Sequence, residues 1–174
     1  MGANFVLYEL RAQSTHKLEV WPGGVEYRLR IGTVPLRDVL LRRKNNNVTS
    51  RFAYTLCANF PNKIAYYCGD RSATWSQMDQ RADQLAAGLQ QLGISQGDTV
   101  AILTHETIEV YEHVFACMKI GAVRVGLNWR YAAEEMRHVL KDSNAKAVIV
   151  QARCRETIEP LLPELVKAGI LVVG

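Results

Sequence analysis

The strongest constraint on the fold is an alternation along residues 64–173, where short apolar runs are separated by longer stretches of helical periodicity. Four of the runs have the length and β-branched content of buried strands, at residues 99–103, 123–127, 147–150 and 170–173. The stretches with helical spacing lie at residues 76–92, 106–120, 132–141 and 158–167. Strands that alternate with helices of this length form right-handed crossover units. We therefore expect an α/β fold, with a doubly wound, mostly parallel sheet flanked by helices in a partial domain.

Local signals predict where the helices begin and end. Ser76 can accept the first free backbone amides of one helix, with Asp79 three residues on in a box-like arrangement. Gly93 and Gly121 follow two helical stretches and can take the left-handed conformation that ends a helix. Pro160 is compatible with the first turn of the helix at 158–167.

The amino-terminal part of the chain has a different pattern. Apolar residues alternate on both sides of Pro22-Gly23-Gly24, which predicts a β-hairpin at about residues 17–31. A helix near Pro35 and a second at about 49–59 should follow. Residues 64–67 and 73–75 then read as two short strands joined at Gly69-Asp70. We expect residues 1–48 to form an extension with this hairpin and a helix, and residues 49–174 to be the start of a larger domain.

Composition excludes several classes of protein. The net charge is +4 over 174 residues, and Arg42-Arg43-Lys44 is better explained as the solvated end of a helix than as a phosphate-binding patch, so nucleic acid is not an expected partner. The chain has no apolar run long enough to span a bilayer and no signal-peptide pattern at its start. The chain has four cysteines, Cys57, Cys68, Cys117 and Cys154. No pair of them has metal-ligand spacing, which favours reduced thiols and a cytoplasmic location.

No complete nucleotide site can be found in the sequence. A phosphate site in such a sheet usually needs a glycine-rich turn after a strand, and neither GxGxxG nor GxxxxGK[ST] occurs. This absence disfavours a small Rossmann-type nucleotide-binding protein. Calorimetric titration with nucleotides would distinguish that class.

No catalytic or metal-ligating residues can be assigned from the sequence. The four histidines form no ligand constellation, and His105 is expected to cap or pack, while His113 and His138 are expected to be structural or on the surface. The carboxylates at Glu106, Glu109 and Glu112 are three residues apart on a helix, which is typical of a solvated face.

The one candidate ligand-binding residue is an arginine near the end of the predicted strand at residues 123–127. Arg124, Asn128 and Arg130 flank the strand at 123–127. Arg130 could offer a forked guanidinium to a phosphate, or it could be a surface arginine that braces the loop.

Several segments resemble one known family in order and spacing. They are Thr74-Trp75-Ser76-Gln77-Met78, Met118-Lys119-Ile120-Gly121-Ala122-Val123, Leu127-Asn128-Trp129-Arg130, Glu135 and the pair Asp142-Ser143. Over about residues 50–150 the chain resembles the adenylate-forming (AMP-binding) superfamily, in the amino-terminal part of an acyl-CoA or aryl-CoA synthetase.

The resemblance implies a function for the parent protein. Such enzymes use ATP and Mg²⁺ to convert a carboxylic acid to an acyl-adenylate, and then pass the acyl group to coenzyme A or a carrier thiol. Their phosphate loop and catalytic lysine lie downstream of the matched stretch, so we expect this chain alone to be inactive and to bind none of these cofactors tightly.

The resemblance also implies partners and one site residue. The remainder of the ligase, in cis or in trans, and a carboxylic acid are the expected partners, and a homodimer is a further possibility. Arg130 occupies the place of an arginine that contacts the coenzyme A nucleotide in some relatives. Two departures lie nearby, because Trp129 stands where proline is common and Thr104-His105-Glu106 stands where Pro-Asn-Ser is common. The alternative function is a stand-alone binding or assembly module of the same fold, which docks a partner through an exposed sheet edge or the hairpin.

Overall fold

The structure, a computed structural model, describes residues 55–174 and two short strands, Leu7–Tyr8 and Leu18–Glu19. The chain forms two compact units. The first, here called the sheet unit, contains residues 1–30, 99–105 and 125–174, and the second, the hairpin unit, contains residues 31–98 and 106–124. Each unit is described by itself.

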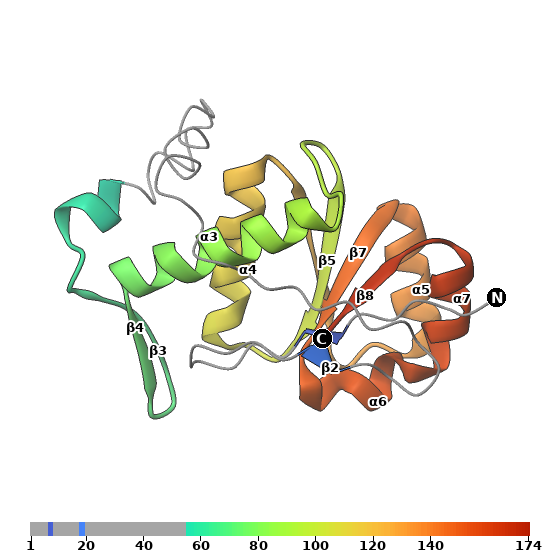
Figure 1. The fold of residues 1–174 in the computed structure, drawn as a ribbon. Helices are drawn as coiled ribbons and strands as arrows, with labels where there is room; N and C mark the ends of the chain where they lie inside the picture. Colours follow the sequence, from blue (N-terminus) through green and yellow to red (C-terminus); the bar gives the residue numbers. More distant parts are fainter. Residues whose placement is uncertain (1–6, 9–17, 20–54) are drawn as a thin grey trace. The chain divides into compact units, whose positions relative to one another are not determined.

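A four-stranded sheet is the framework of the fold (Figure 1). Its strands lie in the order β6-β5-β7-β8, with bounds Val123–Asn128, Thr99–Thr104, Ala145–Val150 and Leu171–Val173. The pairs β5–β7 and β7–β8 are parallel, and Ile102 lies opposite Ile149 in the first of them. The expected α/β class with a parallel sheet is confirmed. The four runs predicted as strands are all strands, each within two residues of the predicted start.

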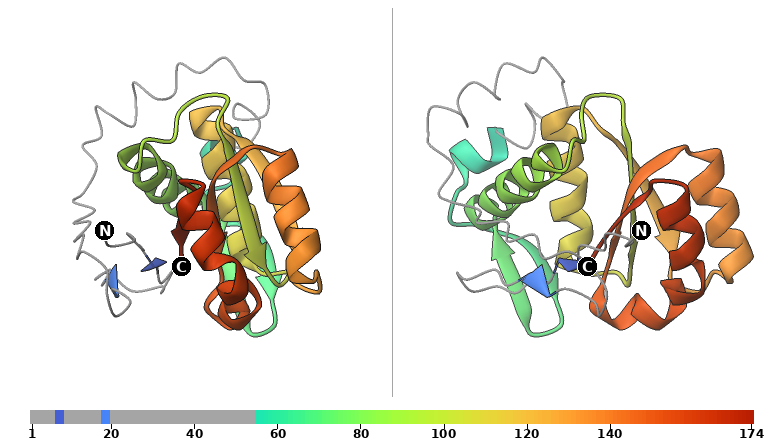
Figure 2. Two further views of the ribbon diagram at one scale, coloured as in Figure 1. Left: turned by 90° about the vertical axis from the view of Figure 1, so that its right-hand side faces the viewer. Right: turned by 45° about the vertical axis from the view of Figure 1, so that its right-hand side comes forward.

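One face of the sheet is covered by helices of the same unit. The views in Figures 1 and 2 agree that α5 (Ala133–Asp142) and α7 (Leu162–Lys167) lie on this face. Alternate residues of the strands and apolar residues of the helical segments form one buried cluster. It includes Ala101, Leu103, Leu127, Met136, Leu140, Val148, Val150, Ile158, Leu161 and Leu165. Because strand side chains alternate between faces, this pattern fixes which residues of β5 and β7 meet the helices.

The last predicted helix is broken rather than continuous. In place of one helix at 158–167 the structure has α6 (Arg155–Ile158), a 3₁₀ turn (Glu159–Leu161) and α7. Pro160 lies in the 3₁₀ turn and Pro163 in the first turn of α7. Proline lacks a backbone donor and clashes with the preceding turn, so two prolines three residues apart divide the helix. The sequence prediction had accommodated only Pro160.

The hairpin unit combines a small antiparallel hairpin with two helices. Strands β3 (Ile64–Cys68) and β4 (Arg71–Thr74) pair, and α3 (Trp75–Gln91) and α4 (Ile108–Ile120) pack against each other. Ala73, Met78 and Ile108 form the buried centre of this unit. Tyr66 stacks on Tyr111 at 4.0 Å between ring centroids and so joins the hairpin to α4. The predicted strand pair and both helices are therefore confirmed.

The start of α3 differs from the prediction. Thr74, not Ser76, is the N-cap residue: its hydroxyl accepts from the backbone N–H of Gln77, and the Gln77 side chain accepts from the N–H of Thr74. The helix begins two residues earlier because this reciprocal box satisfies two free donors at once. At the other ends the prediction is correct, since Gly93 and Gly121 have φ of 87° and 72°.

Of the predictions for the amino-terminal part, the structure describes only a few residues. Leu18–Glu19 pairs antiparallel with Leu7–Tyr8. The rest of the hairpin predicted at 17–31, the helix near Pro35 and the domain boundary at residue 48 lie outside the described residues. Of the helix predicted at 49–59, residues 55–59 are helical. Among the helices that the structure describes, none is long and apolar enough to cross a membrane.

Candidate functional site

The carboxyl ends of the strands in the sheet unit bring several polar and aromatic side chains together. His105 follows β5, Trp129 and Arg130 follow β6, and Gln151 follows β7. In open α/β sheets this edge is where ligands bind, because loops and helix starts converge there. These residues therefore make up the candidate site.

Three side chains from two loops form a stack. The rings of His105 and Trp129 lie 4.3 Å apart between centroids, with 24° between their planes. The guanidinium carbon of Arg130 lies 4.4 Å from the centroid of Trp129. This spacing is in the range of an attractive cation–π contact. The three residues, here called the strand-end stack, join the loop after β5 to the loop after β6.

The imidazole end of the stack is anchored to the loop after β7. The backbone N–H of His105 donates to the side-chain oxygen of Gln151 at 3.1 Å, and Nδ1 of His105 lies 3.5 Å from Sγ of Cys154. The backbone N–H of Gln151 in turn donates to the carbonyl of Leu103 at 2.9 Å. Burial raises the pKa of the Cys154 thiol, so this sulfur is a neutral packing partner rather than a nucleophile.

The arginine end of the stack is exposed and keeps its donors available. The backbone N–H of Arg130 donates to Oδ1 of Asn128 at 3.0 Å, which holds the turn after β6. Among the residues that the structure describes, no carboxylate pairs with the Arg130 guanidinium, whereas Arg71, Arg81 and Arg137 all have carboxylate partners. The sequence therefore identified Arg130 correctly as a residue at the strand end, but it missed its contact with Trp129.

The structure agrees with the expected packing role of His105, but the sequence did not identify Trp129 as its partner. The sequence suggested capping or packing, and the structure places the ring in the strand-end stack. A signal was present, because His105 and Trp129 are the two departures from the usual wording of the family. Two aromatic departures at neighbouring strand ends of one sheet can contact each other, and here they do.

The carboxylates of α4 are not the solvated face that their spacing suggested. Arg71 donates to both oxygens of Glu109, at 2.7 and 3.0 Å, and Arg81 donates to Glu112 at 3.0 Å. Burial alone would raise the pKa of Glu109, but these hydrogen bonds outweigh burial and hold its pKa at about 2. Glu112 is 4% exposed, and burial raises its pKa. Only Glu106 is exposed as expected.

Of two further histidines, His113 is buried and His138 is exposed. His113 is fully buried, with Nε2 3.4 Å from Sγ of Cys117. Burial lowers the pKa of His113 to about 3 and raises that of the Cys117 thiol to about 12. The expected structural role of His113 is consistent with this environment, and His138 is exposed.

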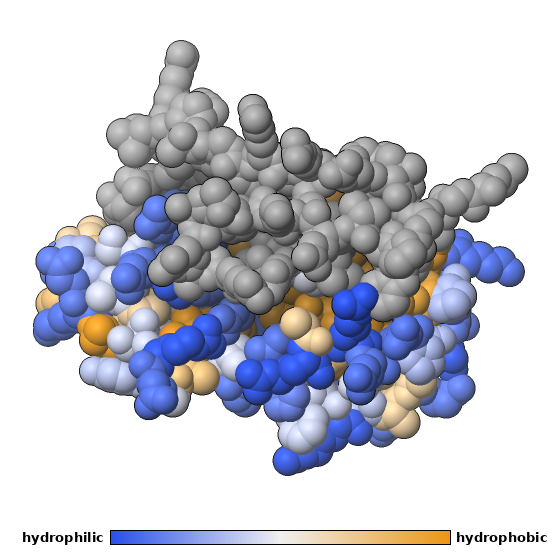
Figure 3. Space-filling model, turned by 60° about the horizontal axis from the view of Figure 1, so that its bottom comes forward, coloured by the Kyte–Doolittle hydropathy of each residue, from blue (hydrophilic) through white to orange (hydrophobic). Residues whose placement is uncertain are grey.

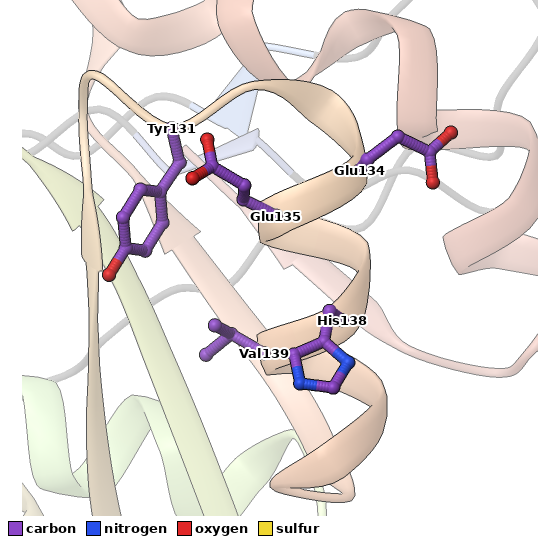
Figure 4. A pocket seen from close by; sticks show the side chains of 5 residues that line it. All are labelled: Tyr131, Glu134, Glu135, His138 and Val139. Carbon is purple, nitrogen blue, oxygen red and sulfur yellow. The ribbon is translucent and has the colours of Figure 1, made fainter.

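A shallow depression of about 400 Å³ lies beside α5 (Figure 4). Its lining residues come from the turn after β6 and from α5, namely Tyr131, Glu134, Glu135, His138 and Val139. Both carboxylates already serve the helix, since Glu135 accepts from the N–H of Ala132 at 2.8 Å and Glu134 pairs with Arg137. In Figure 4, Glu134 points away from Tyr131 and Glu135. These side chains therefore do not converge on a common ligand.

No metal centre is formed by the described part of the chain, since no three His, Cys, Asp or Glu side chains come together there. On the face drawn in Figure 3, hydrophilic residues cover most of the described surface and apolar residues appear in small patches. The strand-end stack is taken as the candidate ligand site because it lies at the carboxyl edge of the sheet and presents an exposed guanidinium.

Comparison with known proteins decides the family. The sequence profile of the family described as AMP-binding enzyme matches residues 54–173, more than half of the chain. The chain belongs to the AMP-binding enzyme family. The resemblance found in its motifs is thereby confirmed, and the sheet with its flanking helices is the first part of the family fold.

Relatives of this AMP-binding chain are much longer than the stretch they share with it. A 3-oxocholest-4-en-26-oate–CoA ligase of Rhodococcus rhodochrous is 32% identical over 64% of the chain and 20% of its own length. A fatty acid–[acyl-carrier-protein] ligase, ScoC of Streptomyces coeruleorubidus, is 33% identical over 58% of the chain and 20% of its own length. The solved Mycobacterium tuberculosis fatty acyl CoA synthetase superposes with a TM-score of 0.65 at 30% identity, over 71% of the chain and 25% of the synthetase. The chain spans about a fifth of the curated relatives that it matches.

Proposed function

We propose that this chain is the amino-terminal portion of an ATP-dependent carboxylic acid–CoA ligase. In this proposal, residues 49–174 begin the ligase domain and residues 1–48 form an extension. The observation that carries the proposal is the family match over residues 54–173 together with relatives named as ligases of acids with CoA or a carrier protein. The whole enzyme uses ATP and Mg²⁺ to make an acyl-adenylate and then forms a thioester with CoA.

The sheet unit contributes a phosphate contact in this scheme. The guanidinium of Arg130 presents a planar fork of N–H donors, which matches the geometry of a phosphate group. It is exposed at the carboxyl edge of the sheet and has no carboxylate partner among the described residues. We assign it to a phosphate of the CoA nucleotide.

The chemistry of adenylation requires residues that this chain does not supply. The sequence has no glycine-rich loop whose backbone amides could hold a triphosphate. In this proposal the chain alone is inactive, and the remainder of the ligase is its partner, in cis or in trans.

A pyrophosphate-release assay tests the assignment to a ligase. The gene product purified from its source, given ATP, Mg²⁺ and a panel of carboxylic acids, should release pyrophosphate with at least one acid. The 174-residue chain alone should release none. Release by the chain alone would contradict its assigned inactivity, and a purified gene product without activity on any acid would contradict the ligase assignment.

The role of Arg130 is tested on the two half-reactions of that gene product. Replacing Arg130 with Ala should raise the KM for CoA about tenfold, because a charge-assisted phosphate contact is lost. The same change should leave adenylate formation unaltered. Lys141→Ala, which removes an exposed charge from the last turn of α5, is the matched control and should alter neither half-reaction.

The second candidate function is a stand-alone binding or assembly module. It is favoured by strand β6, which is an edge strand of the sheet among the described residues and leaves Val123 half exposed. An edge strand presents unpaired backbone groups that can pair with another chain. Sedimentation velocity of the 174-residue chain at increasing concentration distinguishes this candidate, since a module that assembles through β6 should dimerise and Val123→Lys should prevent it. A monomer at all concentrations would remove the support for self-assembly.

A further inference from the structure

We propose that Trp129 is a positioning residue that holds the Arg130 guanidinium ready for a nucleotide phosphate. This inference rests on the proposed role of Arg130 in binding CoA. It goes further because it assigns a task to Trp129 and, through Trp129, to His105. The ligand class is a phosphate attached to an adenosine nucleotide.

Arg130 is an exposed arginine whose side chain is already held in place before any ligand binds. A free arginine side chain samples many rotamers, and fixing it on ligand binding costs conformational entropy. In this structure the guanidinium already lies 4.4 Å from the indole of Trp129. A partner that fixes the side chain before the ligand arrives lowers that cost.

The partner of the Arg130 guanidinium is an aromatic ring, which leaves its N–H donors free. A carboxylate would hold the guanidinium equally well, but it would occupy the N–H fork that a phosphate needs. That is the arrangement of Arg71, whose two terminal nitrogens are both used by Glu109. An aromatic face instead attracts the cation through its π-system and takes none of the in-plane N–H groups. Trp129 is therefore the kind of partner that a phosphate-binding arginine requires.

The indole of Trp129 is itself held in place by its neighbours. Its ring stacks on His105, whose backbone N–H donates to Gln151 and whose ring contacts Cys154. The position of Arg130 is thus determined by the ends of β5, β6 and β7 rather than by its own loop alone. Rigid strand ends position a side chain more accurately than a free loop does.

The test measures binding of adenosine 3′,5′-bisphosphate by calorimetry to the gene product purified from its source, as the unchanged chain and as variants, because the 174 residues alone are expected to bind the cofactors weakly. Trp129→Leu removes the π face but keeps apolar bulk, and it should weaken binding about two- to fivefold, the size of an exposed cation–π contact. Trp129→Phe keeps an aromatic face and should bind within about twofold of the unchanged chain. Arg130→Ala should weaken binding more than tenfold. Lys141→Ala is the charge control and should bind as the unchanged chain does.

The outcomes separate the two proposals. If Trp129→Leu binds as tightly as the unchanged chain, or if Trp129→Phe fails to restore binding, then Trp129 is only an apolar filler and the positioning role is wrong. If Arg130→Ala binds normally, or if the unchanged gene product does not bind the bisphosphate, then the role assigned to Arg130 is wrong and the positioning role is lost with it.

A second measurement needs no ligand. The NMR signal of the Arg130 Nε–H should be shifted by the ring current of Trp129 in the free chain. The shift should persist in Trp129→Phe and disappear in Trp129→Leu. An Arg130 signal that is the same in all three chains would contradict the stack itself.

Discussion

His113 should make the stability of this chain fall steeply between pH 7 and pH 5. Its ring is fully buried in α4, next to Cys117, and in the described part of the chain its Nδ1 has no hydrogen-bond partner. Burial is the main cause that lowers the pKa of His113 from 6.5 to about 3, and the nearby charge of Arg124 adds to the effect. The folded protein therefore holds a neutral imidazole throughout this pH range, whereas the unfolded chain takes up a proton.

Proton linkage gives the direction and the size of the change in stability caused by His113. A depressed pKa in the folded state means that stability is complete above the unfolded pKa of about 6.5 and is lost as the pH falls towards 3. Between pH 7 and pH 5 the expected loss is about 2 kcal/mol. This value barely depends on the folded pKa, because the folded ring stays neutral at pH 5 even if its pKa is one unit higher. Glu109, with a pKa of about 2, contributes mainly at lower pH.

The assay is urea denaturation at pH 7 and at pH 5, with the free energy of unfolding taken from the midpoint and slope. His113→Met replaces the ring with an apolar side chain that does not titrate, so the difference between the two pH values should shrink by about 2 kcal/mol. His138→Gln removes an exposed imidazole and is the matched control, which should keep the pH dependence of the unchanged chain. A His113→Met protein that retains the full pH dependence would refute the reasoning.

Three other predictions concern stability and reactivity. Gly121→Ala should destabilise the fold by about 1–2 kcal/mol, because φ is 72° and the added Cβ would lie 3.0 Å from the Gln96 side chain. Gly88→Ala, in open space within α3, should instead stabilise the fold by up to about 1 kcal/mol. Urea denaturation measures both changes in the free energy of unfolding. Thr74→Ala should cost about 1 kcal/mol through loss of the capping box, and an equal loss in Ser76→Ala would contradict the assigned cap. Cys117, whose pKa burial raises to about 12, should react with a thiol reagent at pH 8 only on unfolding, and rapid labelling of the folded chain would contradict its burial.

Several structural features followed from the sequence alone because they depend on local signals. The alternation of apolar runs and helical stretches predicted every strand of the sheet, since period and length separate strands from helices. Gly93 and Gly121 were recognised as helix ends because the left-handed conformation favours glycine wherever it occurs. The family wording likewise depends on residues in order along the chain, and the profile match over residues 54–173 confirms it.

Other features depended on which residues meet across the fold. The spacing of Glu109 and Glu112 suggested solvated carboxylates, but partners from β4 and α3 pair with them. Ser76 and Thr74 are both good caps, and only the hairpin that leads into α3 decides between them.

The same holds for the candidate site. The sequence placed Arg130 at a strand end and identified a family whose members bind nucleotides. Only the tertiary structure brings His105 and Trp129 together, because parallel strands place their carboxyl ends side by side whatever their separation along the chain. Local periodicity thus determined the elements and the order of the motifs determined the family, while the pairing of distant strand ends decided which side chains could act together.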